Sequence, residues 1–151
     1  MGQSLAQIYI HLVFGTKGRL NLINPEVEEK LHSYMAGILK NLNSPALKIN
    51  SVPDHIHILF RLSKNHALSK VLEEIKKSTS KWMKEQGIIN FTWQIGYGAF
   101  SVSSSKVDTV IKYIENQKTH HQKDSFKDEF ERFAIECELL DYNSQYFWDK
   151  D

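Results

Sequence analysis

Cysteine is nearly absent from this sequence, which contains a single one, Cys137, in 151 residues. One thiol excludes a disulfide-stapled scaffold and any zinc finger that relies on cysteine ligands. Long apolar runs are also missing, since none approaches the roughly 20 residues that a transmembrane helix needs. The first residues carry no basic leader ahead of their apolar stretch, which argues against a signal peptide. We therefore expect a cytoplasmic protein with no membrane partner.

Excess charge of either sign is absent too, because the formal net charge is only +1. Nucleic-acid binding is therefore not indicated by bulk charge and would depend on a local basic patch. The chain does have 41% hydrophobic and 25% charged residues, which is typical of a globular domain. Its length suits one domain that covers residues 1–151.

Regular patterns along the chain predict strands and helices in a definite order. Runs rich in β-branched and aromatic residues predict strands over residues 7–16, 44–52, 55–62 and 91–103. Helical spacing of apolar residues predicts helices over residues 24–42, 67–87, 104–121 and 125–140. Asn24 and Pro25 suit the start of the first helix, and Gly87 suits the end of the second. The order predicts an α+β, ferredoxin-like β-α-β-β-α-β sandwich with an antiparallel sheet plus two C-terminal helices.

Two histidines one residue apart interrupt the apolar stretch "VPDHIHILF", residues 52–60. On a strand, His55 and His57 would point to the same face. Adjacent imidazoles can form one edge of a metal site, although a bare His-x-His pattern more often marks histidines that are hydrogen-bonded on a half-buried strand. Asp54 suits either a turn or an acceptor that orients an imidazole.

A second polar group lies in "VIKYIENQKTHH", residues 110–121. Tyr113 and Gln117 are four residues apart on the predicted helix, so they share one face. Alone, the tyrosine could be a core aromatic and the glutamine plain helix surface. His120 and His121 could add a ligand or a general acid, but we favour the ordinary interpretation, a cationic histidine in the last turn of a helix.

Taken together, these residues suit phosphoryl chemistry. Mg²⁺ keeps several coordination positions open for water or phosphate. Two imidazoles and one amide oxygen would leave about half of an octahedral shell for a substrate phosphate. A phenol one helical turn from the amide is placed to attack the phosphorus, and nearby cationic charge would favour its phenolate. A covalent phosphotyrosine retains the energy of the phosphodiester, so a strand could be rejoined without a nucleotide cofactor.

With these histidines and this tyrosine, the chain resembles a known family, the HUH endonucleases with a single catalytic tyrosine. Within them it is most similar to the transposases of the smallest bacterial insertion sequences and their REP-associated relatives. The resemblance spans nearly the whole chain and is carried by spaced motifs: "IHLVFGTKGR", "INSVPDHIHILF", "LSKVLEEIKKSTSKW", "WQIGYGAFSVS", "VIKYIENQKTHHQKDSFKDEF" and a terminal "YFWD".

The resemblance implies a role for each matching position. Tyr113 would be the nucleophile that forms a 5′-phosphotyrosine bond with DNA. His55, His57 and Gln117 would be the ligands of Mg²⁺ or Mn²⁺. The family acts as homodimers that bind the hairpin ends of single-stranded DNA, then cleave and rejoin the strands.

Basic residues predict where DNA phosphates would bind. Lys17 and Arg19 follow a glycine in "GTKGR", and Lys77 and Lys81 belong to a lysine-rich helix. Interleaved glutamates make a solvated helix face an equal alternative for the last two. A non-catalytic hairpin-binding protein on the same fold is the alternative to a transposase, whereas a nuclease of replication or conjugation is disfavoured by the short chain.

Overall fold

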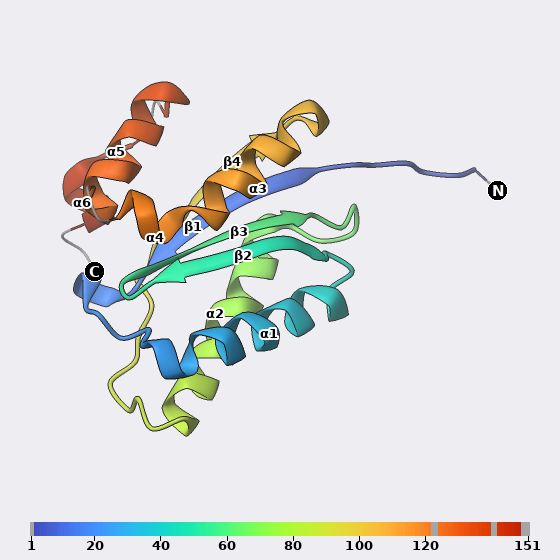
Figure 1. Ribbon diagram of the computed structural model, residues 1–151. Coiled ribbons are helices and arrows are strands. Elements are labelled where there is room, and N and C mark those ends of the chain that lie inside the picture. The colour runs from blue at the N-terminus through green and yellow to red at the C-terminus, as the bar shows by residue number, and fades with distance from the viewer. Residues whose placement is uncertain (1, 122–123, 140–141, 149–151) are drawn as a thin grey trace.

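Four antiparallel strands form one sheet in this computed structural model, which describes residues 2–121, 124–139 and 142–148 (Figure 1). The strands are β1 (Tyr9–Gly15), β2 (Ala46–Val52), β3 (His55–Arg61) and β4 (Gly98–Val102), in the spatial order β2-β3-β1-β4. This order confirms the predicted α+β, ferredoxin-like sandwich. Within the described ranges, no helix is both long and apolar enough to cross a membrane.

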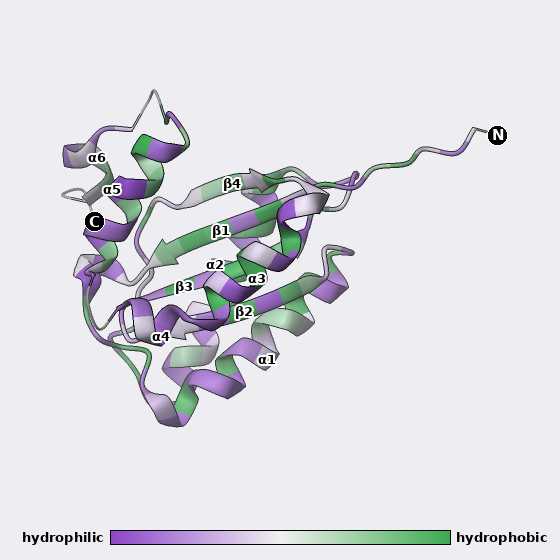
Figure 2. Ribbon diagram, turned by 45° about the horizontal axis from the view of Figure 1, so that its top comes forward, coloured by the Kyte–Doolittle hydropathy of each residue, from purple (hydrophilic) through white to green (hydrophobic). Residues whose placement is uncertain are grey.

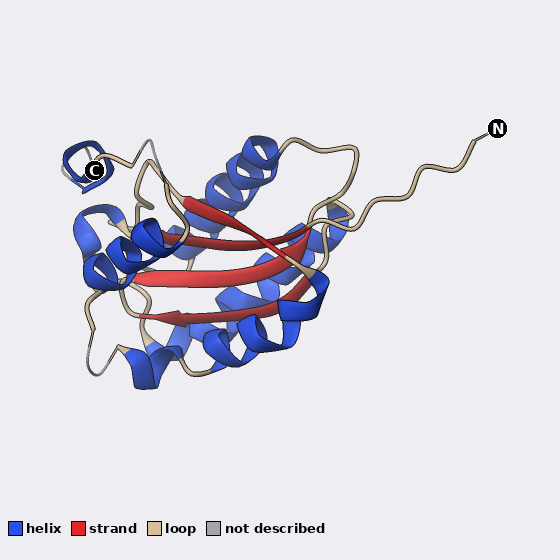
Figure 3. Ribbon diagram, turned by 90° about the horizontal axis from the view of Figure 1, so that it is seen from above, coloured by secondary structure: helices blue, strands red, loops and turns tan. Residues whose placement is uncertain are grey.

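Helices cover both faces of the sheet. On one face, called the inner face here, lie α1 (Pro25–Asn41) and α2 (Leu68–Glu85), and on the outer face lie α3 (Val107–Glu115) and α4 (Gln117–His120) (Figures 1 and 3). The chain continues through α5 (Phe126–Glu136) and α6 (Ser144–Trp148) at one end of the sheet. Two short 3-10 turns, Lys17–Arg19 and Ser104–Lys106, precede α1 and α3.

The predicted ends of the first two helices are confirmed. The Asn24 side chain accepts a hydrogen bond from the N–H of Val27 at 3.1 Å, and Pro25 occupies the first helical position, where no N–H is needed. Gly87 follows α2 with a φ of 99°, a left-handed conformation that favours glycine.

Strand alternation sends apolar side chains to the inner face. Ile10, Leu12 and Phe14 of β1 pack there beside Ile56, Ile58 and Phe60 of β3. Figure 2 shows hydrophobic colouring along both central strands. The helices contribute the opposing apolar stripe: Val27, Leu31, Met35, Leu39, Val71, Leu72, Ile75 and Met83. This large inner core fixes the register of β3 and leaves its alternate residues on the outer face.

The predicted strand over residues 91–103 is shorter than expected, because only Gly98–Val102 pairs in the sheet. Trp93 makes an isolated bridge to Thr16 instead. The Lys76 ammonium donates hydrogen bonds at 2.8–3.1 Å to the backbone carbonyls of residues 94–96. Those carbonyls are therefore satisfied by a side chain of α2 rather than by a neighbouring strand.

The predicted helix over residues 104–121 is interrupted between α3 and α4. Asn50 of β2 donates through its amide to the carbonyls of Ile114 and Glu115, at 2.8 and 3.2 Å. A side chain from the sheet thus captures the carbonyls at the end of α3, and Asn116 leaves helical geometry. The last predicted helix ends at Glu136, and α6 was not predicted. Residue 140 and the aspartate of the terminal "YFWD" lie outside the described residues.

A second, smaller cluster holds α5 against the outer face. We call it the outer cluster; its buried members are Val13, Phe100, Phe126, Phe130 and Trp148. Phe126 and Phe130 approach the sheet where Gly15 of β1 and Gly98 of β4 have no side chain. The missing Cβ atoms therefore set how closely α5 can pack.

Replacing Gly98 with alanine tests this close approach. The new Cβ would collide with the Phe130 ring and lie 3.2 Å from Val13 Cγ1. We expect overpacking to lower the free energy of unfolding by about 1–3 kcal/mol, measured by urea denaturation. Gly37→Ala is the control, since a Cβ at this exposed helical site meets nothing within 4 Å and should add about 0.5–1 kcal/mol. Equal stability of Gly98→Ala and the wild type would contradict this packing.

Candidate active site

His55 and His57 lie side by side on the outer face of β3, and both are fully buried. The register places them opposite Gly15 and Val13 of β1. Because directly opposed residues share a face, the glycine leaves space over His55. The Phe126 ring fills that space and stacks on the imidazole, with centroids 4.1 Å apart.

Each strand histidine is held through its Nδ1 atom. His55 Nδ1 lies 2.7 Å from an Asp54 carboxylate oxygen, and His57 Nδ1 lies 2.8 Å from His11 Nε2. These contacts turn both Nε2 atoms toward the space under α4 and α5. Second partners of this kind orient metal-ligating imidazoles in proteins.

Tyr113 and Gln117 reach the same space from α3 and α4. The Tyr113 ring lies with its centroid 5.9 Å from that of His57 and is half-buried. Gln117 is fully buried, and its Oε1 atom has no hydrogen-bond partner among the described residues. A buried amide oxygen without a partner is an available ligand.

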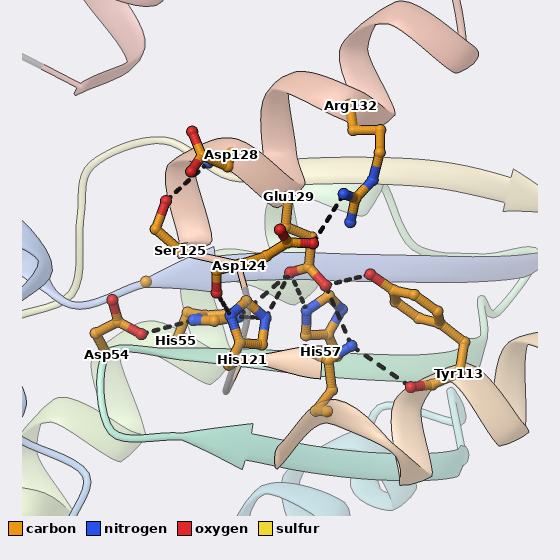
Figure 4. A network of polar contacts seen from close by, with 12 residues as sticks. Asp54, His55, His57, Tyr113, His121, Asp124, Ser125, Asp128, Glu129 and Arg132 are labelled. Carbon is orange, nitrogen blue, oxygen red and sulfur yellow. Dashed lines mark hydrogen bonds and ion pairs between the residues drawn. The ribbon is translucent and has the colours of Figure 1, made fainter. Parts of the chain in front are cut away.

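His121 and Glu129, which follow Gln117 in the chain, complete the cluster, as Figure 4 shows. Glu129 of α5 places Oε1 3.0 Å from His57 Nε2 and 3.1 Å from His121 Nε2. Its Oε2 accepts a hydrogen bond from the Tyr113 hydroxyl and lies 3.3 Å from Gln117 Nε2. One buried carboxylate thus contacts the imidazoles on one side and the phenol on the other.

The electrostatics of the site follow from burial and from this carboxylate. Burial lowers the pKa of His57 to about 4, so its ring is neutral at pH 7. Burial alone would raise the pKa of Glu129, but hydrogen bonds from His121, His55 and His57 hold it well below its ordinary value. For Tyr113, burial and then the charge of Glu129 raise the pKa above 10.0. The phenol is therefore protonated at pH 7, because the nearby Arg132 guanidinium, which lowers the pKa, is outweighed by burial and by the Glu129 carboxylate.

The donor atoms fit a divalent cation. One atom each from His55, His57, His121 and Glu129 lie within 4.8 Å of one another. Imidazole nitrogens and carboxylate oxygens are common ligands of divalent metals, and the unpaired amide oxygen of Gln117 adds another donor nearby.

The predicted DNA-binding residues separate into two groups. Lys17 and Arg19 are exposed in the turn after β1, and the Arg19 guanidinium lies 5.0 Å from the centre of the Trp148 ring in the outer cluster. Lys77 and Lys81 are exposed on α2, across the sheet from the histidines. The structure therefore places Arg19 against the outer cluster, which packs on the face that carries His55 and His57, and it places Lys77 and Lys81 across the sheet.

Three residues of the site were missed or misjudged from the sequence. His121 was expected to be a cationic helix end, but its side chain is only 9% exposed and faces the cluster. Glu129 was not singled out, although an acidic residue on the apolar stripe of Phe126, Phe130 and Phe133 was a signal. His11 was also missed, as a polar residue within an apolar strand.

Comparison with known proteins agrees with the fold. The curated ISDra2 transposase TnpA of Deinococcus radiodurans is 24% identical over 118 residues, covering 74% of this chain and 84% of that protein. A crystal structure of a putative transposase from Deinococcus radiodurans R1 has a TM-score of 0.61 at 22% identity, covering 78% of this chain and 96% of that one. A REP-associated tyrosine transposase bound to a REP hairpin has a TM-score of 0.58 at 16% identity, covering 80% and 74%.

The family model described as "Transposase IS200 like" matches residues 4–117, which is well over half of the chain. It includes the two strand histidines, the tyrosine and the glutamine at its last position. This chain therefore belongs to the IS200-like transposase family.

Proposed function

We propose that this transposase cleaves and rejoins single-stranded DNA at hairpin ends through a covalent bond to Tyr113. The observation that carries the proposal is the position of the Tyr113 hydroxyl, which is hydrogen-bonded at the edge of a buried cluster of imidazoles and a carboxylate. Membership of the family supports action on DNA. The REP hairpin bound by the related transposase supports a hairpin as the partner.

A divalent cation, Mg²⁺ or Mn²⁺, is the proposed cofactor. His55 and His57 would bind it through Nε2, and Gln117 would bind it through the buried amide oxygen. When bound, such a cation polarises a phosphoryl oxygen and offsets negative charge in the transition state.

The chain's own residues supply the nucleophile and an acceptor for its proton. Tyr113 Oη would form a bond to phosphorus while the bond from phosphorus to the 3′ oxygen of the preceding nucleotide breaks, and that oxygen would take a proton from water to leave as a hydroxyl. The phenolic proton has an acceptor in place, Glu129 Oε2. The released 3′ hydroxyl, or that of another strand, would later attack the phosphotyrosine and return the phenol.

A homodimer remains part of the proposal, on the resemblance to the family. The short distance between the rings of Tyr113 and His57 within one chain supports an arrangement in which one subunit supplies both the proposed nucleophile and the strand histidines. A partner subunit would then serve to bring a second DNA end close.

Replacing Tyr113 with phenylalanine tests the nucleophile. We expect wild-type protein with Mn²⁺ and a single-stranded hairpin end to form a denaturant-resistant protein–DNA adduct on a gel, and Tyr113→Phe to form none because the attacking oxygen is gone. Tyr34→Phe is the matched control, since Tyr34 of α1 stacks on Trp82 of α2, on the inner side of the sheet and away from the histidines.

The contrary outcomes are specific. An adduct that persists in Tyr113→Phe would mean that another residue attacks the DNA. Intact hairpin binding by a wild type that never forms an adduct would favour the non-catalytic, hairpin-binding alternative.

Salt dependence tests the four basic residues predicted to contact phosphate. Each lost phosphate contact should lower the slope of log affinity against log salt by roughly 1. We expect the double variant Lys17→Ala and Arg19→Ala to show a larger drop than Lys77→Ala with Lys81→Ala, because Arg19 lies against the outer cluster whereas Lys77 and Lys81 lie on α2, across the sheet from Tyr113. A larger drop for the second pair would place the DNA over α2.

A further inference from the structure

We propose that His121 and Glu129, which lie beyond the matched region, bind the catalytic cation together with His55 and His57. This inference rests on the proposed function and deepens it by adding one imidazole and one carboxylate to the ligands proposed above. The family match ends at residue 117, so two of the four ligands come from the C-terminal segment of the chain.

The short distances around Glu129 support this ligand set. His121 Nε2 lies 3.1 Å from both His55 Nε2 and Glu129 Oε1. His55 Nε2 is 3.4 Å from the same carboxylate oxygen, and His57 Nε2 is 3.0 Å from it. Four donor atoms, from β3, from α5 and from the residue after α4, thus lie within 4.8 Å of one another, and Figure 4 shows the side chains that carry them.

The hydrogen bonds on the far side of two rings fix which nitrogen can bind a cation. His121 Nδ1 lies 2.7 Å from the carbonyl oxygen of Asp124, which can only accept, so Nδ1 carries the proton. His55 Nδ1 likewise donates to the Asp54 carboxylate. If both rings were neutral, their Nε2 atoms would turn lone pairs toward each other at 3.1 Å and could donate no hydrogen bond to Glu129. Only a proton or a cation between them makes this arrangement favourable.

The helix that carries Glu129 is held firmly over the site. Phe126, three residues before it, stacks on the His55 ring, and Phe130, the next residue, is buried in the outer cluster. Burial of these two aromatic rings stabilises the docked position of α5. The carboxylate is therefore positioned before a cation arrives, as tight metal sites require.

This donor set has consequences for both the cation and Gln117. Three imidazoles suit Zn²⁺, Co²⁺ or Mn²⁺, whereas Mg²⁺ prefers oxygen ligands. The Nε2 atom of Gln117, 3.3 Å from Glu129 Oε2, would orient the carboxylate, while its Oε1 atom would still face the cation as a ligand. Because the same Oε2 accepts from the Tyr113 hydroxyl, Glu129 would join the cation and the nucleophile.

Metal binding to the full chain tests the ligand set without reference to activity. After chelator treatment, Zn²⁺ should bind at one site by calorimetry, and Co²⁺ should give the strong visible absorption of low coordination number. We expect His121→Ala and Glu129→Gln each to weaken Zn²⁺ binding by at least about tenfold. Loss of a side chain that only orients a metal ligand already lowers metal affinity by about that factor. His120→Ala is the matched control, because its ring stacks on Tyr113 and is not among the four ligands.

Each outcome bears on the proposal. Circular dichroism of His121→Asn, which keeps a polar side chain, separates loss of a ligand from loss of folding. Wild-type Zn²⁺ affinity in the folded His121 and Glu129 variants, with loss in His57→Ala, would overturn the inference, as would a wild type that binds no Zn²⁺. If the four ligands hold Zn²⁺ but no DNA adduct forms with any cation, this inference stands and the proposed nuclease chemistry fails.

Discussion

The buried carboxylate of Glu129 is the contact on which the rest of the site depends. A carboxylate removed from water stays ionised only when hydrogen bonds and charges offset its lost hydration. Here imidazoles meet Oε1, and the phenol of Tyr113 and the amide of Gln117 meet Oε2. Without it, the strand histidines would face His121 with no counter-charge, and the phenol would lose its acceptor. The placement of α5 is therefore a chemical requirement as well as a packing one.

The sheet holds this carboxylate in place through two separate cores. The inner core under α1 and α2 fixes the register of β3, and a slip of one residue would turn His55 and His57 into that core. The outer cluster then docks α5 over the same strand, through rings that approach the sheet at Gly15 and Gly98. Strand β3, the tyrosine helix and the C-terminal helix thus meet on the outer face of the sheet, which is the arrangement that a preorganised site needs.

The order of elements follows from local patterns, whereas their exact extent does not. Period-2 alternation, helical spacing and the caps at Asn24 and Gly87 are properties of neighbouring residues, so they predict the ferredoxin-like order. The strand expected over residues 91–103 is shorter because Lys76 of α2 occupies carbonyls before β4. The helix expected over residues 104–121 breaks because Asn50 captures carbonyls at the end of α3. Both changes come from side chains distant in sequence, which no local pattern contains.

The same division holds at the site. Residue spacing and backbone geometry are enough to place His55 and His57 on one strand face, and Tyr113 and Gln117 on one helix face. That these two faces meet follows from the packing of the folded chain, which spacing does not contain. The tertiary structure also brought in Glu129, 72 residues from His57, because packing of apolar rings on the outer face, and no periodicity, carries its carboxylate to the imidazoles.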